Sequence, residues 1–213
     1  MIVYNPTEGT PFTGPISSCH RHCFLMTRLG SPIPRMVDKI RDKITQCCAD
    51  YDYDVIDAST RVTGRDFLVK IWKMIASAPL AVGVVHEDMP AKTLANIYYE
   101  LGVAQALGKE TVIVKSPNAE VPSDFVRTEY IPFDANFTKS FKKYLRSLSE
   151  QADYYETLGD QLDRDPVLAI DYYKRSYLIT GDHRLKSKVW DLMKTAGLEE
   201  RATNSVEHIA ASF

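Results

Sequence analysis

The chain has 213 residues, of which 45% are hydrophobic and 25% charged, a composition typical of a globular protein. Its formal net charge of −2 argues against a protein that binds nucleic acid through bulk positive charge, so a nucleic-acid partner is not expected. No apolar stretch approaches the roughly 20 residues that cross a bilayer, and the N-terminus lacks a basic region followed by an apolar block. We therefore expect a cytoplasmic protein without a membrane partner.

The four cysteines are Cys19, Cys23, Cys47 and Cys48, and without a secretory signal we expect them to be free thiols. The run at 19–23 (Cys-His-Arg-His-Cys) contains residue types that bind zinc, but no second pair of ligands follows at a familiar spacing. We expect neither a metal ion nor a cofactor.

Residues 1–18 contain three prolines and two glycines and no apolar period, which indicates an irregular N-terminal arm. After it, short apolar runs alternate with helical patterns. Strands are expected at residues 23–26, 53–57, 80–85, 111–114 and 129–133, with Pro132 favouring an edge position for the last. Helices are expected at residues 35–49, from about 63–66 to just before Pro79, and from about 94 to 107, the last ending at Gly108.

This alternation of strands and helices predicts an α/β fold, a doubly wound (Rossmann-like or flavodoxin-like) parallel sheet of four or five strands. The six apolar residues at 80–85 predict a central strand covered on both faces. We place this α/β domain at residues 19–136.

From residue 137 on, the pattern predicts helices only, at about 137–149, 151–163, 166–179 and 184–196, followed by a frayed tail over 198–213. Residues 152–160 and 169–173 resemble a tetratricopeptide-repeat hairpin, in which an aromatic residue precedes a Leu-Gly pair. One copy is too short for a solenoid. We expect the helical segment 137–213 to pack on the α/β domain, bind a protein partner or join two copies of the chain. Its tyrosines either form the surface for such a dimer or pack within the hairpin.

In open α/β sheets, ligands bind beyond the carboxyl ends of the strands. Three loops occupy that position, at residues 27–34, 57–66 and 86–96. The first combines a glycine with free backbone amides before a helix and could hold a phosphate, although it is neither a Walker loop nor a GxGxxG motif. The residues that these loops offer to a ligand are Arg28, Gly30, Ser31, Asp57, Arg65, Asp66, His86, Glu87, Asp88 and Asn96.

The third expected helix carries Glu100 within a surface of alanine, tyrosine, leucine and glycine that would pack tightly. Asn96 lies four residues earlier, so both side chains share one face of the helix. Gly102 would allow the close approach of another backbone or of a ligand. Glu100 is either a solvated residue, as most helical glutamates are, or a functional carboxylate.

This helix and its surroundings resemble the nucleoside 2-deoxyribosyltransferase-like superfamily. The most specific part is the run 96–109, Asn-Ile-Tyr-Tyr-Glu-Leu-Gly-Val-Ala-Gln-Ala-Leu-Gly-Lys, which follows a buried strand and a loop. Further similarity lies at residues 23–27, 63–72 and 131–134, so the resemblance covers residues 22–145. Related pockets occur in nucleotide N-hydrolases and in Toll/interleukin-receptor (TIR) NAD-cleaving domains, and all of these proteins break or exchange an N-glycosidic bond.

The resemblance implies that Glu100 is the nucleophile, or stabilises the positive charge that develops on the anomeric carbon. Asp88 is the implied second acid, which protonates or holds the leaving base, and Glu87 is the next choice. The chain departs from the family here, because Val-His-Glu-Asp follows the strand where an Ala-Asp-Leu-like run is usual.

The resemblance also implies substrate-binding residues. Asn96 would anchor a ribose hydroxyl or Glu100 itself. Arg28, Gly30 and Ser31 match the loop that holds a phosphate in related nucleotide hydrolases, although its glycine-rich form is lost. Asp66 and His86 complete the predicted set.

We therefore predict an enzyme, an N-glycosyl hydrolase or (deoxy)ribosyltransferase acting on a nucleoside, a nucleotide or NAD. The helical segment favours a version within a larger system, in which such domains act as defence or toxin effectors. A homo-oligomer is expected, since members of the superfamily commonly complete their pockets with a neighbouring subunit. The alternatives are a non-catalytic nucleotide sensor acting through a protein partner, which would not need Glu100, and a scaffold that uses only the helical hairpin.

Overall fold

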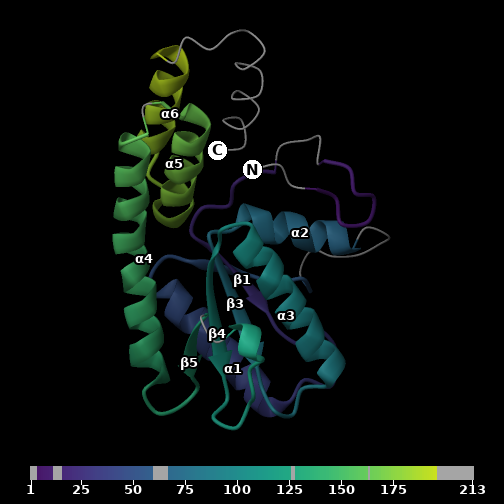
Figure 1. The fold of residues 1–213 in the computed structure, drawn as a ribbon. Coiled ribbons are helices and arrows are strands. Elements are labelled where there is room, and N and C mark those ends of the chain that lie inside the picture. The colour runs from purple at the N-terminus through teal and green to yellow at the C-terminus, as the bar shows by residue number, and fades with distance from the viewer. Residues whose placement is uncertain (1–3, 12–15, 60–66, 126–127, 163, 196–213) are drawn as a thin grey trace. The chain divides into compact units, whose positions relative to one another are not determined.

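A computed structural model gives the fold and describes residues 4–11, 16–59, 67–125, 128–162 and 164–195 (Figure 1). The chain divides into two compact units, which we call the α/β unit (residues 22–146) and the helical unit (residues 1–21 with 147–213). The tail predicted at 198–213 lies outside the described residues, as does the predicted start of the second helix at 63–66.

The α/β unit contains a five-stranded, wholly parallel sheet in the order β2-β1-β3-β4-β5, which confirms the predicted doubly wound fold. Its strands are β1 (His22–Met26), β2 (Asp54–Ile56), β3 (Leu80–Val85), β4 (Glu110–Lys115) and β5 (Glu129–Pro132). The apolar run 80–85 is the central strand β3, buried along its whole length. β5 lies at an edge, as Pro132 indicates, because proline cannot donate to a further strand.

Three helices connect the strands: α1 (Arg35–Ala49), α2 (Phe67–Ser77) and α3 (Ala91–Ala106). α1 lies on one face of the sheet and α2 with α3 on the other (Figure 1), as right-handed crossovers in this strand order require. A short 3-10 helix, η1 (Ser123–Phe125), precedes β5. α3 starts at Ala91 rather than Leu94, because Pro90 has the fixed φ that suits a residue just ahead of a helix. Gly108, with φ +67, follows the end of α3 in the left-handed conformation that favours glycine.

The C-terminal helices are α4 (Phe137–Asp160), α5 (Pro166–Thr180) and α6 (Arg184–Thr195). The prediction of two helices over 137–163 was wrong, since α4 is one helix of 24 residues. Its buried residues Phe141, Leu145, Leu148 and Ala152 continue at spacings of four, three and four, and no proline or glycine interrupts the helix near Glu150. Residues 137–146 of α4 belong to the α/β unit and residues 147–160 to the helical unit.

The helical unit has an apolar cluster on α5 and α6, formed by Ala169, Ile170, Tyr173, Tyr177, Leu185 and Val189. Gly159 on α4 lies directly against the ring of Tyr173, since a Cβ at residue 159 would be 2.6 Å from Cε1 of that ring. Tyr173 and Tyr177 therefore pack within the unit, whereas Tyr154 is exposed. The N-terminal segment joins this unit through Arg21, whose backbone N–H donates to the Leu178 carbonyl over 2.8 Å.

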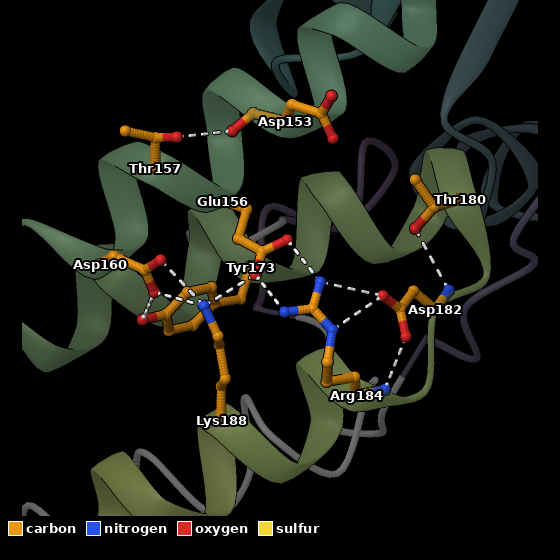
Figure 2. Close-up of polar contacts among 9 residues, drawn as sticks. All are labelled: Asp153, Glu156, Thr157, Asp160, Tyr173, Thr180, Asp182, Arg184 and Lys188. Carbon is orange, nitrogen blue, oxygen red and sulfur yellow. Dashed lines mark hydrogen bonds and ion pairs between the residues drawn. The ribbon is translucent and has the colours of Figure 1, made fainter.

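A network of charged side chains connects α4 with α6 in the helical unit (Figure 2). Arg184 donates to both carboxylate oxygens of Glu156, over 2.8 and 2.9 Å. Lys188 donates to Asp160 over 2.6 and 2.9 Å and lies 2.7 Å from Glu156 Oε1. The hydroxyl of Tyr173 donates to Asp160 over 2.9 Å, so the network also reaches α5.

None of the described helices is both long enough and apolar enough to cross a membrane.

Candidate functional site

Four of the six buried polar residues described in the α/β unit lie at the carboxyl edge of the sheet; the other two are Ser77, at the end of α2, and Thr128, just before β5. The first residue after each of the first four strands is polar and buried: Thr27 follows β1, Asp57 follows β2, His86 follows β3 and Ser116 follows β4. Because the strands are parallel, these four residues lie along one edge in the spatial order Asp57, Thr27, His86, Ser116. Burying polar groups costs free energy unless they have partners, so this row requires a chemical explanation.

The centre of the row is the point where the strand order reverses. β1 and β3 are neighbours, and the helices that follow them, α1 and α3, leave toward opposite faces of the sheet. The loops after these strands therefore diverge, and doubly wound sheets commonly bind ligands at such a point. Thr27 and His86 lie at this position. Oγ1 of Thr27 is buried and has no hydrogen-bond partner among the described residues.

The loop after β3 brings three predicted residues together. His86 is buried, and its Nδ1 accepts a hydrogen bond from the backbone N–H of Asp88 over 3.1 Å. The same Nδ1 lies 3.7 Å from the Glu87 carboxylate and 3.6 Å from that of Asp88. An accepting Nδ1 leaves the proton of a neutral imidazole on Nε2, which makes Nε2 a donor.

Glu87 and Asp88 differ in their surroundings. The hydroxyl of Ser116 donates to Glu87 Oε2, and this hydrogen bond is the main reason why the pKa of Glu87 is lowered from its ordinary value. Glu87 is therefore held in place as a carboxylate at neutral pH. The Asp88 side chain is 69% exposed, and its contacts within the described chain are those with His86.

Asp57 follows the edge strand β2, and both of its carboxylate oxygens accept hydrogen bonds. Its Oδ2 accepts from Arg41 of α1 over 3.0 Å, and its Oδ1 accepts from the backbone N–H of Ser59 over 2.9 Å. The Ser59 hydroxyl also donates to Oδ1. These bonds fix the beginning of the loop after β2. Asp66, predicted further along this loop, lies outside the described residues.

Glu100 lies on α3 and is half-buried. Burial raises the pKa of Glu100 to about 7, because desolvation disfavours the charged form. Within the described part of the chain no hydrogen bond or ion pair to its carboxylate is found. The described residues therefore compensate little of the charge that forms near pH 7.

The packing of α3 on the sheet determines where Glu100 lies along the direction of the strands. The next residue, Leu101, lies directly over Gly83 of β3, since a Cβ on Gly83 would be 2.7 Å from Leu101 Cδ1. Gly83 pairs with Met26, the last residue of β1. Glu100 therefore lies at the level of the sheet where β1 ends and Thr27 follows.

The remaining predicted residues are more exposed. In the loop after β1, Arg28 is half-buried, while Gly30 and Ser31 are exposed. Asn96 is exposed, and among the described residues no hydrogen bond joins it to Glu100, four residues along the helix. Among the described residues, no hydrogen bond or ion pair connects these residues with Asp88.

Ser116 was missed by the sequence analysis, although its position follows the same rule as His86. It comes directly after a buried strand, and its partner Glu87 is 29 residues away in the sequence. The rule that ligand-binding residues follow the carboxyl ends of strands applies to Ser116, the first residue after β4, as well. Its pairing with Glu87 follows from β3 and β4 being neighbours.

A separate groove of about 430 Å³ lies along α2 and α3. It is lined by Trp72, Tyr98, Tyr99, Gly102, Val103, Ala106 and Leu107. None of the predicted site residues lines it, and it contains no charged side chain. The described residues also contain no group of three or more histidine, cysteine, aspartate or glutamate side chains placed to hold a metal ion.

No protein-family model matches the chain, and no curated protein matches it. Among solved structures, it is similar to one reported under the characterization of 2-deoxyribosyltransferase from the psychrotolerant bacterium Bacillus psychrosaccharolyticus. The identity is 15%, the TM-score is 0.42, and the match covers 57% of this chain and 90% of that chain.

Proposed function

We propose that the protein is an N-glycosidase that cleaves or exchanges the bond between base and ribose in a nucleoside, a nucleotide or NAD. The observation that supports this function is Glu100, a half-buried carboxylate with a pKa of about 7 at the level where β1 ends. A carboxyl group near a topological switch point, with its ionisation tuned to neutral pH, is a candidate functional group for physical reasons alone.

The chemistry requires a carboxylate that is not already neutralised. As the C1′–N bond breaks, positive charge develops on the anomeric carbon and the base leaves with the bonding electron pair. Ionised Glu100 either stabilises this charge or attacks C1′, forming a C1′–O ester that water or a second base then displaces. Desolvation strengthens the attraction between Glu100 and the cationic carbon, because the effective dielectric constant is low.

The leaving base must be held or receive a proton. We assign this role to Asp88, whose carboxylate is exposed beside His86, and not to Glu87. Glu87 is bonded to Ser116 and has a lowered pKa, so it is a poor proton donor at neutral pH. Glu87 fits better as a fixed acceptor for a base N–H group.

The test is release of free base, measured by chromatography after incubation with nucleosides, nucleotides and NAD. Glu100→Gln keeps the size of the side chain but removes its charge. We expect base release to fall by about 10²–10³-fold for a lost electrostatic contact, and further for a lost nucleophile. Glu150→Gln, at an exposed glutamate of α4, is the matched control and should leave the rate unchanged.

Thermal melting distinguishes lost chemistry from lost folding. The folded-state pKa of Glu100 is raised, so the folded protein binds a proton more tightly than the unfolded chain, and stability falls as pH rises from about 4.5 to 7. Glu100→Gln removes this cost and should be at least as stable as the wild type at pH 8.

A wild type that binds nucleotides but releases no base would support the nucleotide sensor instead.

A further inference from the structure

Gly83 is buried in the middle of β3, between Met26 of β1 and Ile113 of β4. A Cβ at this position would be 2.7 Å from Leu101 Cδ1, 3.2 Å from Leu101 Cγ and 3.2 Å from Ile97 Cγ2. Side chains in proteins essentially never approach a Cβ to less than 3.0 Å. These atoms belong to side chains, so a Cβ at residue 83 would require Leu101, and to a smaller extent Ile97, to move.

The two residues above Gly83 have little room to yield. Leu101 is fully buried and Ile97 is 2% exposed, so both are surrounded by other core atoms. Added volume in such a core is accommodated partly by shifts of the backbone. Any part of this shift that α3 takes up also moves Glu100, because Glu100 directly precedes Leu101.

Gly102 provides a comparison on the same helix. No atom lies within 4 Å of the position that a Cβ would take there. The sequence analysis expected another backbone or a ligand to come close to Gly102; no other described backbone does so, and Gly102 lines the groove along α2 and α3. Of Gly83 and Gly102, only Gly83 has side chains packed against the position that a Cβ would take.

We infer that Gly83 is a positioning residue, which sets how deeply Glu100 is held in the α/β unit by letting α3 contact β3. An effect of Gly83 on catalysis depends on the proposed N-glycosidase function. The effect of residue 83 on the surroundings of Glu100 is independent of that function.

The experiment measures the ionisation of Glu100 directly, by ¹³C NMR of protein labelled at the glutamate carboxyl carbon, with Glu100→Gln for assignment. Burial holds the wild-type midpoint near pH 7. In Gly83→Ala the displaced helix exposes Glu100 to more water, and the midpoint should fall by roughly half a unit or more toward the ordinary value. Gly102→Ala, the matched control, should leave it unchanged.

A second pair of variants tests the contact itself. Leu101→Val removes the atom nearest to a new Cβ, so Gly83→Ala should shift the midpoint less in the Leu101→Val background than in the wild type. If Gly83→Ala alone does not fold, the double variant is compared with Leu101→Val, and a lower midpoint in the double variant supports the inference. An unchanged Glu100 midpoint in every folded variant that carries Gly83→Ala overturns it.

Base release by the same proteins separates this inference from the proposed function. If the wild type is active, Gly83→Ala should lower kcat by about 10-fold with a smaller change in KM, because misplacing a catalytic group mainly affects the transition state. If the wild type releases no base, the N-glycosidase proposal fails, and the NMR midpoints still decide whether Gly83 positions Glu100.

Discussion

The α/β unit and the helical unit place their polar side chains in opposite ways. In the α/β unit, the central strand is wholly apolar, and buried polar residues stand at the carboxyl ends of the strands, where Thr27 and His86 flank the switch point. In the helical unit, charged side chains bond to one another across α4 and α6 (Figure 2). The polar groups of the helical unit thus bond to one another, whereas Thr27 of the α/β unit has no hydrogen-bond partner among the described residues.

Within the helical unit, the largest effect on stability is expected from Gly159→Ala. The new Cβ would lie 2.6 and 2.8 Å from two ring carbons of Tyr173, and that ring is held by its hydrogen bond to Asp160. We expect a loss of about 1–3 kcal/mol from overpacking, although alanine is the better helix former. Gly102→Ala, where the space is open, should instead stabilise the protein by about 0.5–1 kcal/mol. Thermal melting of both variants measures the difference, and equal effects would contradict it.

A smaller effect is expected from Lys188→Met, which keeps most of the stem but removes the contacts with Glu156 and Asp160. Partly exposed ion pairs of this kind contribute up to about 1 kcal/mol. Burial alone would raise the pKa of both acids. At Glu156, hydrogen bonds from Lys188 and Arg184 outweigh burial and lower the pKa. At Asp160, hydrogen bonds from Lys188 and Tyr173 do the same.

The sign of the pH dependence follows from these lowered pKa values. The network contributes stability above the unfolded-state pKa values of about 4, and this contribution is lost as pH falls below them. The difference between wild type and Lys188→Met should therefore be present at pH 7 and shrink toward pH 2. Lys139→Met, at an exposed lysine of α4, is the control. A difference that does not depend on pH would show that the ion pairs are not its source.

The smallest effect on stability is expected from Thr27→Val in the α/β unit. Valine has the shape of threonine without the hydroxyl, and this hydroxyl has no partner among the described residues. The melting temperature should stay the same or rise, because no hydrogen bond is lost and a buried polar atom is removed. If the row of polar residues binds substrate, affinity for a nucleoside should fall several-fold, measured by titration calorimetry, and Thr27→Ser should retain it. Unchanged affinity in Thr27→Val would exclude Thr27 from binding.

Sequence reasoning predicts the elements whose pattern is local. α1 and β3 were predicted with their observed bounds, because hydrophobic periodicity and a continuous apolar run need no tertiary information. The continuity of α4 was missed, since two helices were predicted over 137–149 and 151–163 although no proline or glycine lies between them to end a helix.

The site depends on contacts that sequence patterns do not carry. Placing His86, Glu87 and Asp88 after a strand requires only the strand prediction, but the bond between Ser116 and Glu87 depends on which strands are neighbours. The close packing at Gly83 likewise joins residues from two elements, β3 and α3. The raised pKa of Glu100 is a result of tertiary burial, so the residue type could be singled out from the sequence but not its ionisation.

The most direct test of the central claim is the pH dependence of kcat/KM for base release, since this ratio reports the ionisation of the free enzyme. If ionised Glu100 carries the reaction, kcat/KM should rise as pH increases through about 7 and level off above it. The same rise should be absent from the residual activity of Glu100→Gln. A wild-type profile that is flat between pH 5 and 8, or a rise that persists in Glu100→Gln, would contradict the assignment of Glu100 as the catalytic carboxylate.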